Sequence, residues 1–232
     1  MPNHEDVKAF YEDEYYGVPS ARAYMPWHMR LIARRLGPLH GKRVLDIACG
    51  TGQWLKHLEG RGAKVAGIDI SDRALQVARE YLPDADLQQG VAESLPFDDS
   101  QFDFVTCLGS LEHFLDQPAA LREMQRVAKP GSQILILVPN AGFLTRRAGL
   151  YRGTDQVAIQ ETVRSITDWE GLFDSEGLTV QQRWRDLHPL SRAWIFRGSV
   201  GNRLMRLLQA TALAVWPIAW QYQVYFVCKA SS

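Results

Sequence analysis

Residues Val44–Gly52 read VLDIACGTG, a short apolar run that ends in two glycines separated by one threonine. The run predicts a buried strand, and the residues that follow it, Gln53–Leu58, predict a helix. Glycine in the turn between them lets a ligand approach the backbone where a Cβ atom would clash. A strand, a glycine turn and a helix in this order indicate a site for a nucleotide-like cofactor.

The same alternation extends over Gly41 to Pro139. Helices are predicted after Ser71, which can cap the first turn, and at Pro118–Val127. The strand-like segments are Lys42–Ala48, Ala63–Ile70, Asp84–Gln89, Phe102–Leu108 and Gln133–Val138. This order predicts an α/β fold, in which helices cover both faces of a parallel sheet and the ligand lies beyond the carboxyl ends of the strands.

Three features narrow the choice among NAD, FAD and S-adenosylmethionine. A dinucleotide turn has a third glycine, and here Leu55 stands in its place. Asp46 lies inside the strand, where a carboxylate needs hydrogen-bond donors or a cation. Asp69 ends the next strand, close to the spacing of about 20 residues at which an acid binds ribose hydroxyls.

With these features in view, VLDIACGTG resembles the first motif of the class I S-adenosylmethionine-dependent methyltransferases, with Ala48 where glycine is frequent. Further segments are similar to the family's later motifs and follow in its order: GIDIS (Gly67–Ser71), GVAESLPFDDSQFDFV (Gly90–Val105), LGSLEHF (Leu108–Phe114) and AKPGS (Ala128–Ser132). The resemblance implies a three-layer Rossmann-like sandwich, with a seven-stranded, mostly parallel sheet whose last strand is antiparallel. It also implies S-adenosyl-L-methionine as the cofactor.

The resemblance also implies a set of cofactor-binding residues. Asp69 would accept the ribose hydroxyls, while Glu93 or a backbone carbonyl would replace an aspartate that the family often has at Val91. The residues expected at the methionine half are Asp46, Ala48, Gly50, Gly52, Leu108 and Gly109. Those expected beside the adenine are Ile70, Ala92 and Glu93.

The sequence leaves the catalytic residue open, because methyl transfer needs a general base only when the acceptor loses a proton late. The candidates are His113, His28 and Tyr16, and His188 is a further histidine that could reach the acceptor. In similar methyltransferases the N-terminal region covers the cofactor. Tyr11, Tyr15, Tyr16, Tyr24 and Trp27 therefore suit a lid wall, with ordinary helix packing as the alternative.

We expect a single methyltransferase domain over 1–232, made of an N-terminal helical lid (1–40), a cofactor-binding core (41–139) and an acceptor-side part with the closing strands (140–232). Helix Asp168–Ser175 and strands Leu178–Trp184 and Tyr222–Cys228 complete the expected sheet. Between them lies a C-terminal insertion whose segment Leu204–Trp220 is strongly apolar but broken by polar residues and Pro217. It is interpreted as a helix buried against the sheet, with a lid or peripheral membrane contact through 203–220 as the alternative.

Composition sets further limits. The formal net charge of zero disfavours a nucleic-acid partner, whose binding proteins are usually basic. The three cysteines show no metal-type spacing and, with no secretory signal at the start, favour a reducing cytoplasm. The leading interpretation is methyl transfer to a small-molecule or lipid-like acceptor, without a metal. The alternatives are a non-catalytic S-adenosylmethionine-binding module and a nucleotide-cofactor oxidoreductase.

Overall fold

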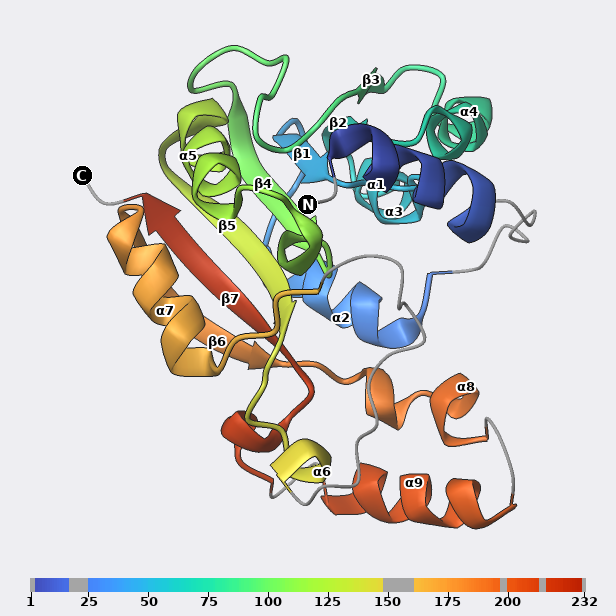
Figure 1. The fold of residues 1–232 in the computed structure, drawn as a ribbon. Helices are drawn as coiled ribbons and strands as arrows, with labels where there is room; N and C mark the ends of the chain where they lie inside the picture. The colour runs from blue at the N-terminus through green and yellow to red at the C-terminus, as the bar shows by residue number, and fades with distance from the viewer. Residues whose placement is uncertain (1–2, 17–24, 148–160, 197–199, 213–215, 231–232) are drawn as a thin grey trace.

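The fold is a seven-stranded sheet with helices on both faces, as predicted (Figure 1). The computed structural model describes residues 3–16, 25–147, 161–196, 200–212 and 216–230. The strand order is β3-β2-β1-β4-β5-β7-β6, and β7 runs antiparallel to both of its neighbours. The strands are β1 (Arg43–Ile47), β2 (Lys64–Asp69), β3 (Asp86–Gln89), β4 (Phe102–Leu108), β5 (Ala128–Pro139), β6 (Leu178–Arg185) and β7 (Gln223–Ala230).

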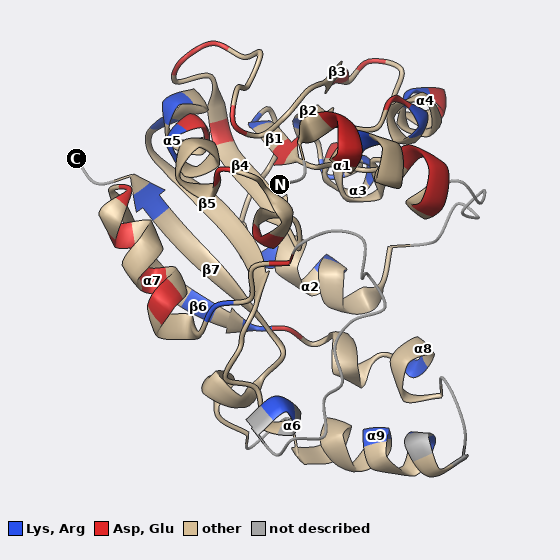
Figure 2. Ribbon diagram, in the orientation of Figure 1, with Lys and Arg blue, Asp and Glu red and all other residues tan. Residues whose placement is uncertain are grey.

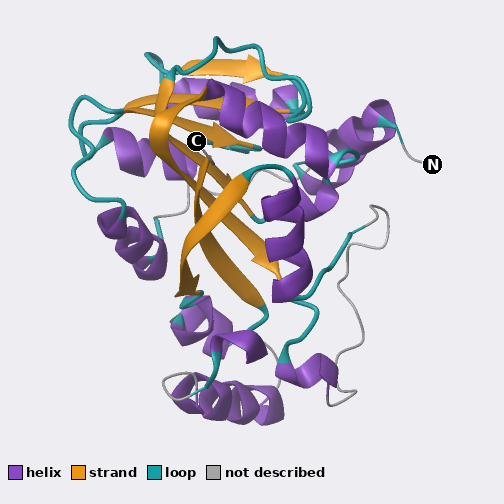
Figure 3. Ribbon diagram, turned by 90° about the vertical axis from the view of Figure 1, so that its left-hand side faces the viewer, coloured by secondary structure: helices purple, strands orange, loops and turns teal. Residues whose placement is uncertain are grey.

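The helices form the two outer layers (Figure 3). Helices α5 and α7 pack on one face of the sheet, and α2, α3 and α4 pack on the other. The α-helices are α1 (His4–Phe10), α2 (Trp27–Arg35), α3 (Gln53–Glu59), α4 (Asp72–Tyr81), α5 (Gln117–Val127), α6 (Leu144–Arg147), α7 (Ile166–Ser175), α8 (Arg192–Ile195) and α9 (Val200–Ala212). Short helical turns are η1 (Tyr11–Tyr15), η2 (Leu111–His113), η3 (His188–Leu190) and η4 (Ile218–Trp220).

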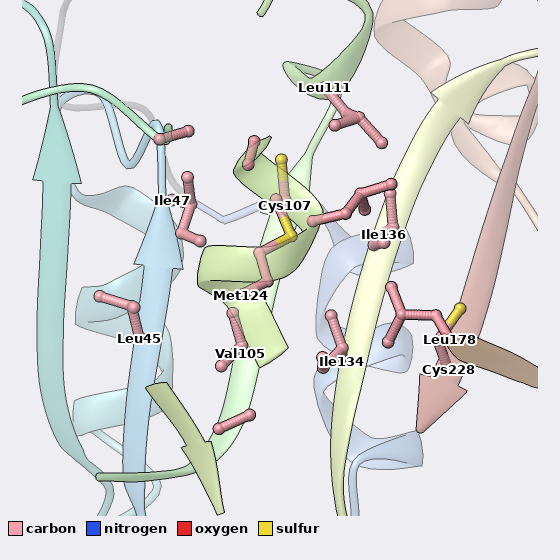
Figure 4. Close-up of a cluster of buried hydrophobic side chains, with 14 of the residues drawn as sticks. Leu45, Ile47, Val105, Cys107, Leu111, Met124, Ile134, Ile136, Leu178 and Cys228 are labelled. Atoms are coloured by element: carbon pink, nitrogen blue, oxygen red, sulfur yellow. The ribbon is translucent and has the colours of Figure 1, made fainter. Parts of the chain in front are cut away.

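The central strands are apolar because both of their faces are covered. Side chains from β1, β4 and β5 meet Met124 of α5 in one buried cluster, as Figure 4 shows. The opposite cluster joins Leu55 and Leu58 of α3 to Val44 of β1. This double packing fixes the strands and therefore the loops that follow their carboxyl ends.

Side-chain caps fix where the helices begin. Ser71 accepts a hydrogen bond from the Ala74 backbone N–H at 3.2 Å, which confirms it as the cap of α4. Asp116 caps α5 in the same way, with Pro118 in its first turn. Each cap satisfies a backbone donor that a helix leaves without an internal partner.

One strand is longer than predicted. β5 begins at Ala128 rather than at Gln133, because Ala128 pairs with Phe102 and the register with β4 shifts beyond that pair. The Lys129-Pro130-Gly131 segment, directly after α5, is part of this irregular strand start.

The interpretation of the C-terminal insertion as a helix buried against the sheet is wrong. α9 contacts α8 and η3, and it lies at the outer end of the molecule (Figure 1). Leu204 and Leu208 expose 61% and 70% of their surface. Residues 213–215 of the predicted segment lie outside the described residues. Within the described part of the chain, every helix is too short or too polar to cross a bilayer.

Candidate active site

A cavity of about 890 Å³ opens at the carboxyl ends of β1, β2 and β4. These strands are neighbours in the sheet, so the loops that follow them meet at one edge. The N-terminal elements α1 and η1 supply the opposite wall through His4, Val7 and three tyrosines. Ligand pockets commonly measure about 300–1,000 Å³, so this cavity is large enough for a cofactor together with a small acceptor.

The glycine turn and Asp69 form one hydrogen-bonded unit in this cavity. The Gly50 backbone N–H donates to Asp69 Oδ2 at 2.7 Å, and the Ser71 N–H donates to Oδ1 at 2.9 Å. Burial raises the pKa of Asp69, while these donors oppose that change. A Cβ atom at Gly50 would lie 2.7 Å from the Tyr16 hydroxyl, so only glycine leaves room for this hydroxyl against the turn.

Most residues expected to bind the cofactor line this cavity, and two do not. Both exceptions are in the first motif: Asp46 and Gly52. The predicted residues that line the cavity are Ala48, Gly50, Asp69, Ile70, Ala92, Glu93, Leu108 and Gly109. The sequence motifs therefore located the cavity, although which of these residues contact a cofactor stays a prediction.

Asp46 lies beneath the cavity, within the sheet. It is 4% exposed and its Oδ1 accepts a hydrogen bond from the Thr106 hydroxyl at 2.6 Å. The Thr106 oxygen accepts in turn from the Trp54 indole N–H at 3.2 Å. Burial raises the pKa of Asp46 to about 7. The donor that a strand carboxylate requires is thus supplied by the neighbouring strand.

Gly52 serves packing rather than the cavity. Its φ is +73°, and a Cβ atom there would lie 2.9 Å from Leu82 and 3.0 Å from Ala78. The glycine therefore lets α4 approach the start of α3. Ala48 also has a left-handed φ of 57°, which explains why glycine is frequent at this position in similar sequences.

The described aromatic residues of the N-terminal region divide between the cavity and the helix layer. Tyr11, Tyr15 and Tyr16 line the cavity, and burial raises the pKa of Tyr11 and of Tyr16. Glu12 ties this region to α4, because its backbone carbonyl accepts a hydrogen bond from Arg73 at 2.8 Å. Trp27 lies on α2 and does not line the cavity. Tyr24 lies outside the described residues, as does the rest of 17–24 within the expected lid.

The catalytic candidates fall in two places. Tyr16 and His113 line the cavity, and burial lowers the pKa of His113. His28 lies outside it, 6% exposed, and its ring centre is 5.3 Å from that of His188. Burial lowers the pKa of His28 to about 4, and repulsion from His188 adds to this. These two histidines therefore pack against each other and line no part of this cavity.

Glu112 is a cavity residue that the sequence analysis did not single out. It is 3% exposed, and within the described chain its Oε2 has no hydrogen-bond partner. Burial raises the pKa of Glu112 to about 8, and the charge of Glu161 adds to this. The sequence feature that could have identified Glu112 is its position as a charged residue in the motif LGSLEHF, directly before His113.

Comparison with known proteins agrees with this geometry. Residues 45–136 match the family model described as "Methyltransferase domain". Residues 45–136 are a methyltransferase domain of the class I family. The methyl donor of this family is S-adenosylmethionine. The matched segment includes the glycine turn, Asp69 and Glu112, and thus the ends of the strands around the cavity.

The chain spans about half the length of two curated relatives that it matches. One is "Ubiquinone biosynthesis O-methyltransferase" of Alkalilimnicola ehrlichii, 38% identical over 120 residues that cover 50% of this chain and 49% of the relative. The other is "Demethylmenaquinone methyltransferase" of Staphylococcus aureus, 35% identical over 131 residues that cover 54% of each.

A solved structure extends the likeness of fold beyond the methyltransferase domain. It is the complex of the Haloferax volcanii Trm112 methyltransferase activator with a methyltransferase, and its matching chain has a TM-score of 0.69. The match covers 89% of this chain and 90% of the other, at 23% identity. At that identity the match shows the fold alone.

Proposed function

We propose that this chain transfers a methyl group from S-adenosylmethionine to a small-molecule acceptor of the quinone type. The observation that carries the proposal is the cavity at the strand ends, where Asp69 and the Gly50 turn face a space large enough for donor and acceptor. The names of the two relatives, one an O-methyltransferase of ubiquinone biosynthesis, support the acceptor class.

The residues around the cavity fit the cofactor in charge and shape. The Asp69 carboxylate would accept hydrogen bonds from the ribose hydroxyls, because it has lone pairs beyond those that its backbone donors use. Gly50 lines the cavity and presents no Cβ atom to it. Ile70 and Ala92 give the adenine end an apolar wall, and Leu108 and Gly109 border the methionine end.

When bound, S-adenosylmethionine supplies a methyl group that is electrophilic because its sulfur is a sulfonium cation. The chain would orient the donor and the acceptor, exclude water from the cavity and supply a group that accepts a proton. Tyr11, Tyr15 and Tyr16 line one side of the cavity, where they would exclude water and where aromatic rings would favour a cation. Burial keeps most of Glu112 protonated at neutral pH, and its deprotonated fraction would take the proton of an acceptor hydroxyl; His113 lies beside it in the sequence.

The setting of the reaction is part of the proposal. Three buried free cysteines, Cys49, Cys107 and Cys228, suit a reducing cytoplasm. The proposal includes no nucleic-acid partner, because the net charge of the chain is zero. It includes peripheral membrane contact through 203–220, where a lipid-like acceptor would be found.

The first test is calorimetric titration with S-adenosylmethionine, S-adenosylhomocysteine and NADH. We expect binding of the first two only. Asp69→Asn should weaken that binding about 5- to 150-fold, which corresponds to roughly 1–3 kcal/mol for a lost charge-assisted hydrogen bond. Asp174→Asn on the exposed part of α7 is the matched control and should bind as the parent does. NADH binding, or unchanged affinity of a folded Asp69→Asn protein, would overturn the cofactor assignment.

The second test follows transfer of an isotope-labelled methyl group to quinol and catechol acceptors without a side chain. We expect labelled product from the parent protein and a rate reduced about 100-fold or more in Glu112→Gln, which keeps the shape and loses the base. Donor binding without transfer to any acceptor offered would favour the non-catalytic module over the enzyme.

A further inference from the structure

Helix α9 turns its apolar face outward. Leu204, Leu207 and Leu208 are spaced to share one helix face, and they are 61%, 49% and 70% exposed. On the other side, Ala210 is 7% exposed. Arg206 also points inward, where its guanidinium donates to the Trp194 carbonyl at 2.8 Å and lies 5.0 Å from the Trp194 ring centre. A surface helix usually packs the opposite way, with its leucines on the protein.

Exposed aromatic and basic residues lie at the same end of the molecule, on α6, α8, α9 and η4 (Figure 1). Phe196, at the end of α8, is 61% exposed, and Trp220 is 39% exposed. Arg146, Arg192 and Arg203 are also exposed on α6, α8 and α9. In Figure 2 these three helices carry blue segments and no red ones. After Asp186 the sequence contains no further acidic residue up to residue 232.

We infer that this surface, defined by Phe196, Leu204, Leu207, Leu208 and Trp220 with its arginines, docks on an anionic lipid bilayer. α9 has 13 residues, fewer than the about 20 needed to cross a bilayer, so it lies along the surface. Its leucines enter the boundary between headgroups and acyl chains, while the arginines meet lipid phosphates. The inference extends the membrane contact included in the proposed function, and its test does not depend on methyl transfer.

The shape and charge of the surface favour lipid over another protein. The leucines form a convex ridge along a single short helix, and a stable protein interface needs about 800 Å² of complementary surface on each partner. A bilayer accommodates a convex apolar ridge without a matching groove. A second copy of the chain would bring the same arginines together, and like charges at an interface are unfavourable.

The test is sedimentation of the full chain with vesicles of phosphatidylcholine alone and with added phosphatidylglycerol. We expect binding only to the anionic vesicles, weakened at about 1 M salt, where the screening length is roughly 3 Å. The double variant Leu204→Gln, Leu208→Gln should lower the partition coefficient about tenfold or more. Trp27→Gln, an exposed aromatic on α2, is the matched apolar control and should bind as the parent does.

Charge is tested with Arg192→Glu against Lys64→Glu, which makes the same change at the start of β2. Only Arg192→Glu should weaken binding to anionic vesicles. Parent protein that does not bind them, or a double variant that binds equally well, would overturn the inference. So would a dimer in light scattering that the double variant abolishes, because the second copy would then be the occupant. Calorimetry with S-adenosylmethionine on the same variants keeps a failed membrane test separate from a failed cofactor assignment.

Discussion

Replacing Glu112 by glutamine should stabilise the protein at neutral pH. The side chain is 3% exposed, and no described residue contacts its Oε2 with a hydrogen bond. Burial therefore raises its pKa from 4.5 to about 8. Between these values the folded protein keeps the carboxyl proton and the unfolded chain releases it. Glutamine resembles the protonated carboxyl in shape and has no proton to release.

The magnitude follows from the pKa shift. Since the folded-state pKa is the higher one, the free energy of unfolding of the parent is unaffected below pH 4.5 and falls as pH rises toward 8. At about 1.4 kcal/mol for each unit, the loss between pH 5 and pH 7.5 is about 3 kcal/mol. Glu112→Gln does not undergo this loss. The difference in free energy of unfolding between the variant and the parent should therefore grow by about that amount between pH 5 and pH 7.5.

Urea unfolding at pH 5 and pH 7.5 measures this difference, and the other ionisable groups cancel between parent and variant. Glu123→Gln is a control for which we expect the opposite change in stability. Glu123 accepts hydrogen bonds from Arg126, which lower its pKa, so this variant should lose stability at pH 7.5. A Glu112→Gln protein with the same advantage at both pH values, or with none, would refute the assignment of a protonated, buried Glu112.

Three further predictions concern stability measured by urea unfolding. Ala48→Gly should stabilise by about 0.5–1 kcal/mol, because Ala48 has a φ of 57°; Ala74→Gly inside α4 is the control and should destabilise by about 1 kcal/mol. Gly52→Ala should destabilise by roughly 2 kcal/mol, since its Cβ would meet Leu82 at 2.9 Å; a neutral effect would contradict the packing role. His28 has a folded-state pKa of about 4, below its unfolded value of 6.5, so the parent should lose about 1 kcal/mol as pH falls from 7 to 5. His28→Gln should not show that loss, and a parallel pH dependence would argue against a neutral, buried His28.

The sequence predicted those parts of the fold whose signals are local. The run VLDIACGTG contains most of the strand, the turn and the residue that precedes the helix within nine residues, so periodicity and glycine suffice to place them. Asp69 was found because it ends a strand at a familiar spacing from the turn. Whether each of these residues faces the cavity depends on partners that lie far away in the sequence. Asp46 meets Thr106, which lies 60 residues away in the sequence, and Gly52 packs on α4.

The role of Glu112 and the orientation of α9 also depend on contacts between distant parts of the sequence. Glu112 stands in a short turn, where no periodicity distinguishes a buried carboxylate from an exposed one. Its importance appears only in the folded chain, where it is buried at the cavity near the charge of Glu161. For α9 the sequence showed a strongly apolar segment, and that composition fits a helix packed on the sheet. The exposure of Leu204 and Leu208 and the inward position of Arg206 show that the leucines face outward.

The place of β7 in the sheet has a consequence for the nascent chain. β7 lies between β5 and β6, although it follows both in the sequence. From Arg185, the end of β6, to Ala230, the end of β7, the chain adds 45 residues. At about 5–20 residues per second, roughly two to nine seconds pass during which β5 has an unpaired edge and β6 has no strand partner. Open strand edges pair readily with other chains, so this interval is when the growing protein is most exposed to aggregation and most dependent on chaperones.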